Sequence, residues 1–252
     1  MAKLPYKAVC GIPAETLAMH RAYSHGLGLP EVGDRPVAAQ LLVIGNAPTI
    51  GKYVDVFRAW DGDIWAINGA FDWCMANGID AALYCVDPVY MTDKAARAVL
   101  ADTCQPALFD AVPDVTLARI GEGNISHWCT AASTAPMIAA ECGYHHVTFY
   151  GVDSSFTNRT HAHEFLPTTD SRIWVDCGGR EFETNATMII QAEFMAEMAR
   201  ALPKFMTVKG DGFLPALIEH GDHDVTHITQ DIHDLLYGVN PQQEQETNHA
   251  SQ

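Results

Sequence analysis

The sequence predicts an α/β fold: a Rossmann-like, mostly parallel sheet flanked by helices, with a small inserted hairpin or lid. The first observation is a steady alternation of short apolar runs with amphipathic segments, which favours strand–helix–strand units with right-handed crossovers. The second is the run 41–44, which is apolar at every position and is therefore typical of a buried strand. The third is that such runs end in Gly, Asn or Asp, which are common turn residues.

The first half of the chain contains the clearest alternation. A strand is expected at 41–45, and apolar side chains at helical spacing predict a helix over 50–60. The other elements expected before residue 120 are a helix at 13–22, a strand at 64–67, a helix at 71–76, a strand at 81–86, a helix at 93–101, and short strands at 107–109 and 115–117.

The second half continues the pattern with one interruption. The expected elements are a helix at 130–142, a strand at 146–150, strands at 173–176 and 180–183, a helix at 186–202, a strand at 205–208 and a helix at 214–219. Residues 154–185 break the alternation, and we interpret them as a lid or insert that contains the hairpin. We expect residues 1–240 to form one Rossmann-like domain and the Gln-rich segment 241–252 to be disordered.

Composition argues against several classes of partner. The 31 acidic and 15 basic residues give a formal net charge of −16, which disfavours binding to nucleic acid or to an anionic membrane. The 7 cysteines form no CxxC pair, as expected of reduced thiols rather than of a zinc site or a disulfide framework. No apolar run is long enough for a signal peptide or a membrane span, so we expect a cytoplasmic protein with small-molecule ligands. A homo-oligomer is compatible with this composition.

Polar residues follow four of the expected strands. Gly45-Asn46-Ala47-Pro48-Thr49 follows the first strand, Asn68 the second, Asp87 the third, and Asp153 the strand at 146–150. The carboxyl ends of parallel strands meet at one edge of the sheet, and ligands of open α/β sheets bind there, near the point where the strand order reverses. The sequence therefore predicts a ligand site at this edge.

The residue types indicate how a nucleotide would be held. Backbone N–H groups of the 45–49 loop suit a phosphate, and the amides of Asn46 and Asn68 suit a phosphate or a ribose. Asp87 and Asp153 are candidate ligands for Mg²⁺ or for a sugar hydroxyl. The loop is neither a P-loop, since no Gly-Lys-Ser/Thr follows, nor a GxGxxG fingerprint. Alternatively, each of these residues only forms a turn or a helix cap.

The insert carries side chains suited to catalysis. His161 or His163 could deprotonate an acceptor hydroxyl, and the planar guanidinium groups of Arg159 and Arg172 could hold a phosphate. Asp153, just before the insert, is the third candidate catalytic residue. The alternative interpretation is that these are solvated loop residues in a chain with 12 histidines.

The sequence also resembles a known family. The likeness rests on Val43-Ile44-Gly45-Asn46-Ala47-Pro48-Thr49-Ile50, Ala66-Ile67-Asn68-Gly69, Cys85-Val86-Asp87-Pro88 and Val147-Thr148-Phe149-Tyr150-Gly151-Val152-Asp153. In this order they resemble segments of the MptE-like 6-hydroxymethylpterin diphosphokinases, although Ala47 and Thr49 stand where that family has Gly and Ser. The resemblance implies transfer of a diphosphate from ATP, with Mg²⁺, to a hydroxymethyl group of a pterin-like acceptor.

Two alternatives remain open. The same segments are similar to those of bacterial CMP-sialic acid-dependent sialyltransferases, in which two asparagines contact the nucleotide and a histidine is the base. Asn46 and Asn68 stand at the positions of these asparagines, and His161 or His163 is the candidate base. This likeness implies a glycosyltransferase that uses a CMP-sugar donor. The second alternative is a nucleotide-binding protein without catalytic activity.

Overall fold

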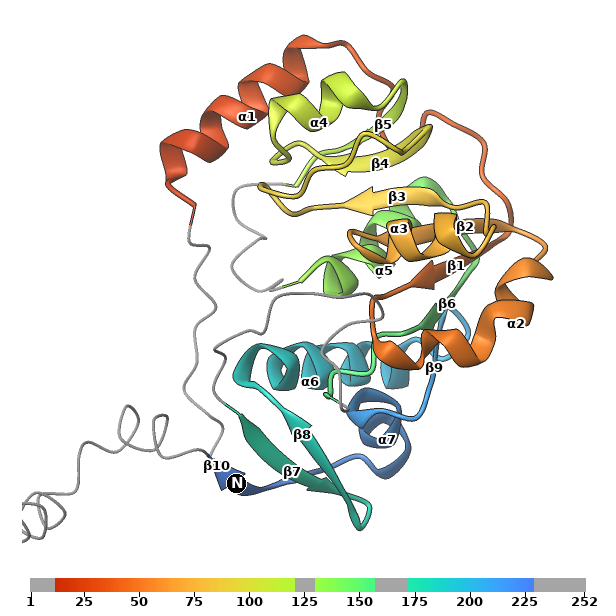
Figure 1. Ribbon diagram of the computed structural model, residues 1–252, viewed down its shortest axis with the longest axis vertical. Coiled ribbons are helices and arrows are strands. Elements are labelled where there is room, and N and C mark those ends of the chain that lie inside the picture. The colour runs from red at the N-terminus through yellow and green to blue at the C-terminus, as the bar shows by residue number, and fades with distance from the viewer. Residues whose placement is uncertain (1–11, 121–129, 157–171, 229–252) are drawn as a thin grey trace, which may run out of the picture.

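The computed structural model describes residues 12–120, 130–156 and 172–228 (Figure 1). Within them, seven parallel strands form one sheet in the order β5-β4-β3-β2-β1-β6-β9. The strands are β1 (Gln40–Ile44), β2 (Asp63–Ile67), β3 (Ala82–Cys85), β4 (Arg97–Ala101), β5 (Asp114–Ala118), β6 (His146–Tyr150) and β9 (Met206–Lys209). The prediction of a Rossmann-like α/β fold is confirmed.

Helices cover both faces of this sheet (Figure 1). One face packs against the 3₁₀ helix η1 (Pro48–Tyr53), α2 (Val54–Arg58), α3 (Ala70–Ala76) and α4 (Pro106–Ala111), with α1 (Ala14–Gly26) beside α4. The other face packs against α5 (Ala131–Cys142) and α6 (Ala186–Ala201), with α7 (Phe213–His220) beside α6. None of the helices in these ranges is long and apolar enough to cross a membrane.

The central strand β1 shows why the apolar runs are continuous. Leu41 and Val43 lie in the core that includes α5 and α6, whereas Leu42 and Ile44 lie in the core of the opposite face. All four side chains are 0% exposed, and each contributes roughly 1.5–3 kcal/mol through burial. Successive residues of a strand point to opposite faces, so a strand with helices on both sides needs apolar residues throughout.

A smaller antiparallel sheet has the order β10-β7-β8, from β7 (Ile173–Cys177), β8 (Arg180–Thr184) and β10 (Asp224–Ile228). Gly178 and Gly179 form the β7–β8 turn with φ of 63° and 76°, backbone angles that suit a two-residue hairpin turn. The hairpin predicted inside the insert is therefore confirmed. The rest of the insert, 157–171, lies outside the described residues, as does the segment 241–252.

Three elements differ from the sequence-based expectation. The helix predicted at 93–101 is wrong, because 97–101 form strand β4; the strand predicted at 107–109 is wrong, because these residues lie in α4. Strand β4 pairs with β3 and β5, and its last four residues are buried, so sheet packing outweighs the helix propensity of its alanines. Strand β10 was not predicted.

The strand order locates a switch point. From β1 the chain adds β2, β3, β4 and β5 on one side, and then β6 pairs with the other side of β1. The direction of winding thus reverses between β1 and β6. In open α/β sheets this is the place where ligands bind, outside the carboxyl ends of the strands.

Candidate functional site

The backbones at the ends of β1 and β6 are in direct contact. The N–H of Gly45 donates to the carbonyl of Tyr150 at 2.8 Å, and the N–H of Ala47 donates to the carbonyl of Gly151 at 3.0 Å. A Cβ atom at position 45 would lie 2.3 Å from the carbonyl oxygen of Gly151. Gly45 is therefore required for the close approach of the two strand ends.

Because of this contact between the strand ends, the 45–49 loop has a structural role. The N–H groups of Gly45 and Ala47 are engaged with β6, so they are not available to a phosphate. The predicted helix over 50–60 is divided into η1, which Pro48 begins, and α2. The hydroxyl of Thr49 donates to Oδ2 of Asp153 at 2.5 Å. The loop thus aligns the end of β1 with the end of β6.

Asp153 joins three elements at the switch point. It is 2% exposed, and its backbone carbonyl accepts a hydrogen bond from the N–H of Leu214 at 2.9 Å. A Cβ atom at Gly212 would lie 2.3 Å from Cβ of Asp153, so the β9–α7 loop fits closely around this residue. Burial raises the pKa of the Asp153 carboxyl, the hydrogen bond from Thr49 lowers it, and the charge of Asp211 raises it.

Three buried oxygens at this edge of the sheet have no hydrogen-bond partner within the described ranges. They are Oδ1 of Asn46, Oδ1 of Asn68 and Oδ1 of Asp153. These residues follow β1, β2 and β6, which are neighbours in the sheet. Buried polar atoms of folded proteins are almost always hydrogen-bonded. The unpaired acceptors at the switch point are therefore suited to a ligand that donates hydrogen bonds.

Two residues at the same edge have unusual backbone angles. Asn68 and Ser154 have φ of 45° and 52°, and they are the non-glycine residues with positive φ in the part of the chain that the structure describes. The carbonyl of Asn68 accepts a hydrogen bond from the N–H of Phe71 at 2.9 Å, which fixes this turn at the start of α3. Such conformations are uncommon outside glycine and concentrate at functional sites.

A buried polar chain supports Ser154. Nε2 of Gln191 donates to Oγ of Ser154 at 2.8 Å, and the hydroxyl of Thr130 donates to Oε1 of Gln191 at 2.6 Å. Thr130 also caps α5 by accepting a hydrogen bond from the N–H of Ser133. The chain ties α5 and α6 to the end of β6. Gln191 was not predicted as a site residue, although a glutamine within the apolar face of a helix is a usable signal.

Asp87 does not belong to the group of unpaired oxygens formed by Asn46, Asn68 and Asp153. Its Oδ1 accepts a hydrogen bond from the N–H of Val89 at 3.0 Å, as in a simple turn. Its strand, β3, is separated from β6 by β2 and β1, so at about 4.8 Å per strand the ends of β3 and β6 lie about 14 Å apart. Asp87 and Asp153 therefore do not meet at one Mg²⁺ ion. Across the described ranges, no group of three or more His, Cys, Asp or Glu side chains could hold a metal ion.

Of the predicted site residues in the insert, the structure describes only Arg172. Arg159, His161 and His163 lie outside the described residues, and their roles stay predictions. Arg172, within the insert, is paired with Glu183 at 3.1 Å and lies over the ring of Phe156, with 3.8 Å between its Cζ and the ring centroid.

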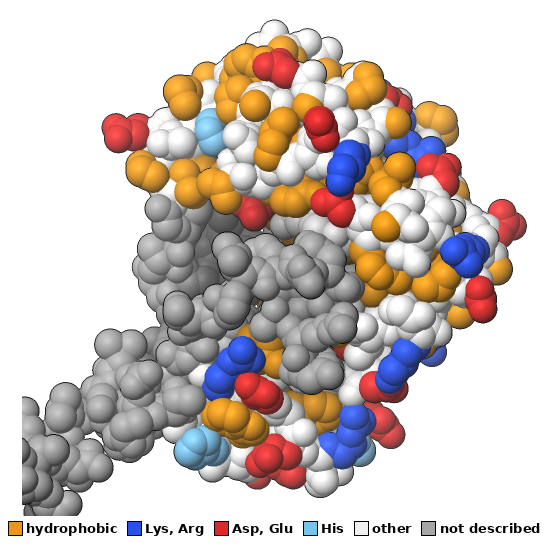
Figure 2. Space-filling view, in the orientation of Figure 1, with side chains coloured by type: hydrophobic (Ala, Val, Ile, Leu, Met, Phe, Trp, Pro, Cys, Tyr) orange, Lys and Arg blue, Asp and Glu red, His pale blue; other side chains and the backbone are white. Residues whose placement is uncertain are grey.

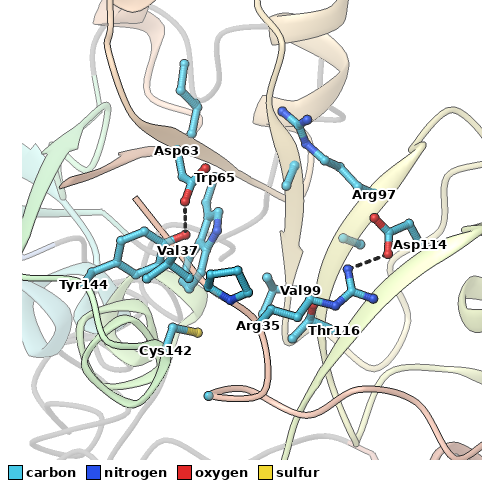
Figure 3. Close-up of a pocket in the computed structure, with 15 residues that line it drawn as sticks. Arg35, Val37, Asp63, Trp65, Arg97, Val99, Asp114, Thr116, Cys142 and Tyr144 are labelled. Carbon is cyan, nitrogen blue, oxygen red and sulfur yellow. Dashed lines mark hydrogen bonds and ion pairs between the residues drawn. The ribbon is translucent and has the colours of Figure 1, made fainter. Parts of the chain in front are cut away.

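A cavity of about 270 Å³ lies at the opposite edge of the sheet (Figure 3). Its walls come from the amino ends of β2 to β5, the 33–37 loop and the last turn of α5. The hydroxyl of Tyr144 donates to Asp63 at 2.8 Å, and Arg35 pairs with Asp114 at 2.6 Å. These polar groups satisfy one another, in contrast to the unpaired oxygens at the carboxyl ends.

Comparison with known proteins gives one informative likeness. No protein-family model matches the sequence, and no curated protein matches it significantly. The structure is similar to that of the MAf glycosyltransferase from Magnetospirillum magneticum AMB-1, with a TM-score of 0.55 and 16% sequence identity. The alignment covers 78% of this chain and 36% of that chain, so the chain spans about a third of that protein. At this identity the likeness shows a shared fold, and it does not support the resemblance to the diphosphokinases.

Proposed function

We propose that this chain is a glycosyltransferase that binds a nucleotide-sugar donor, a CMP-sugar, at the carboxyl ends of β1 and β2. The observation that carries this proposal is the pair of buried, unpaired amide oxygens of Asn46 and Asn68 beside the switch point. The fold likeness to a glycosyltransferase supports the same class of enzyme.

The chemistry of the two asparagines fits a nucleoside. An amide oxygen accepts hydrogen bonds, and the ribose hydroxyls and the amino group of cytosine donate them. Because β1 and β2 are adjacent, their ends lie about 4.8 Å apart, a spacing that one nucleoside can bridge. We therefore place the nucleoside, rather than the phosphate, at Asn46 and Asn68.

In the proposed transfer, an acceptor hydroxyl attacks the anomeric carbon of the donor sugar. The bond between this carbon and the phosphate oxygen breaks, CMP leaves with the bonding pair, and the hydroxyl proton passes to a base. His161 or His163 is the proposed base. Asp153 is a positioning residue, because it fixes the end of β6 to η1 and α7. Asp87 and Asp153 lie too far apart to share one Mg²⁺ ion, so neither acts as a metal ligand in the proposed transfer.

Calorimetric titration with CMP and with ATP, each with and without Mg²⁺, tests the proposal. We expect CMP to bind with the same affinity in both conditions. Asn46→Ala and Asn68→Ala should each weaken CMP binding about tenfold or more, because each removes a hydrogen bond worth about 1.4 kcal/mol. Asn77→Ala is the matched control, since its side chain only caps α3 by donating to the carbonyl of Trp73 at 2.8 Å.

Two results would contradict the proposal. One is tight, Mg²⁺-dependent binding of ATP without binding of CMP, which would favour diphosphate transfer. The other is an equal effect of the Asn46, Asn68 and Asn77 substitutions, which would remove the assigned role of the strand ends.

A further inference from the structure

The three-stranded sheet has one face in the core and one face toward solvent. Ile173, Val175 and Cys177 of β7 are buried in the core that includes α6 and α7. Side chains alternate along a strand, so the outward face of β7 carries Trp174 and Asp176. This outward face lies toward the viewer in Figure 2, where hydrophobic, acidic, basic and histidine side chains gather over β7, β8 and β10.

Trp174 lies at the centre of this outward face. In the sheet register its neighbours are Glu183 on β8 and His227 on β10. The rings of Trp174 and His227 have centroids 5.1 Å apart, and Glu183 pairs with Arg172 at 3.1 Å. The half-buried indole thus has the imidazole of His227 on one side and the carboxylate of Glu183, itself paired with Arg172, on the other. All three of these groups are planar and can form hydrogen bonds at their edges.

We infer that this face, which we call the Trp174 surface, binds a carbohydrate and holds the acceptor of the transfer reaction. The apolar C–H face of a pyranose ring stacks on an indole, and its hydroxyls need both donors and acceptors around the ring. Arg172 supplies donors, Glu183 supplies acceptors, and His227 supplies either. An anionic ligand would be repelled by Glu183, Asp176 and Glu181, whereas a cationic ligand would have to compete with Arg172 for Glu183.

The Trp174 surface is continuous with the switch point. The N–H of Phe156, three residues after Asp153, donates to the carbonyl of Glu183 at 2.7 Å. The hydroxyl of Thr184, the next residue of β8, donates to the carbonyl of Ser154 at 2.8 Å. Strand β8 is therefore attached directly to the segment that leaves β6. A sugar bound at Trp174 would therefore lie on a strand pair that is attached to the switch point, and its role as acceptor rests on the proposed function.

The test is an NMR titration that follows the indole N–H signals of the 5 tryptophans. The probes are maltotriose, lactose and triacetylchitotriose, and Trp174→Phe assigns the Trp174 signal. We expect at least one probe to shift this signal saturably. Calorimetric titration, which does not need the indole signal, then compares the variants. Trp174→Ala should weaken binding of that probe at least tenfold, whereas Trp174→Tyr, which keeps an aromatic face, should stay within about threefold. Val56→Ala, at a side chain 43% exposed on α2, is the control and should have no effect.

The same variants separate this inference from the proposed function. Trp174→Ala should bind CMP as tightly as the unaltered protein. If CMP binds but no probe shifts the Trp174 signal, or if pentalysine shifts it and the sugars do not, the carbohydrate assignment is overturned while the proposed function stands. If the sugars bind at Trp174 but CMP does not bind, the proposed function fails and the surface remains a carbohydrate-binding one.

Discussion

Asp153 illustrates how a single buried carboxylate can organise the switch point. Its Oδ2 accepts the Thr49 hydroxyl, its carbonyl accepts the Leu214 N–H, and its Oδ1 has no partner within the described ranges. Burial disfavours the charged form and raises its pKa above the ordinary value of 3.8. Keeping the ionised carboxylate of Asp153 buried therefore costs stability.

The raised pKa predicts a specific dependence of stability on pH. Between 3.8 and the higher pKa of the folded state, the folded protein binds more protons at Asp153 than the unfolded chain does. The free energy of unfolding should therefore fall as the pH rises through this interval. Asp153→Asn, which cannot ionise, should remove this fall and should be at least as stable as the unaltered protein at pH 7.

Urea unfolding of both proteins at several pH values from 3.5 to 7 measures this difference. Parallel curves of unfolding free energy against pH would show that Asp153 is not held in the environment described here.

At the scale of elements, the contact between the ends of β1 and β6 depends on glycine. In Gly45→Ala the new methyl group would overlap the carbonyl of Gly151, so we expect a loss of about 2–4 kcal/mol in the free energy of unfolding. Gly51 in η1 is the matched control, because a Cβ atom there meets no atom within 4 Å. Gly51→Ala should change stability by less than about 1 kcal/mol. Chemical denaturation measures both variants, and equal losses would refute the assigned role of Gly45.

The elements that could be predicted from the sequence are those whose residue pattern is compatible with a single type of secondary structure. The continuous apolar run of β1 and the Gly-Gly turn between β7 and β8 each favour a single structure. The stretch 93–109 was misassigned because Ala-rich segments suit either a helix or a buried strand until their neighbours are known. Strand β10 was missed because its residues are mostly exposed and, among the described strands, it pairs with β7 alone.

At the scale of the whole molecule, strand order decides which predicted site residues meet. The sequence shows polar residues after four strands, but it does not show that β6 returns to the side of β1. That return brings Asp153 to Thr49, whereas Asp87 follows β3, which β2 and β1 separate from β6. It also engages the N–H groups of Gly45 and Ala47, which the sequence alone presents as free for a phosphate. That Asn46, Asn68 and Asp153 follow strands at one edge of the sheet was therefore predictable, whereas their hydrogen-bond partners were not.

The central claim is that Asn46 and Asn68 bind a nucleoside at the carboxyl ends of β1 and β2. A crystal structure of the complex with CMP tests it most directly. We predict that the cytosine or ribose lies within hydrogen-bond distance of both amide oxygens, next to the end of β6. CMP bound instead in the cavity beside Trp65 and Tyr144, or at any place that leaves Asn46 and Asn68 without contact, would contradict the account.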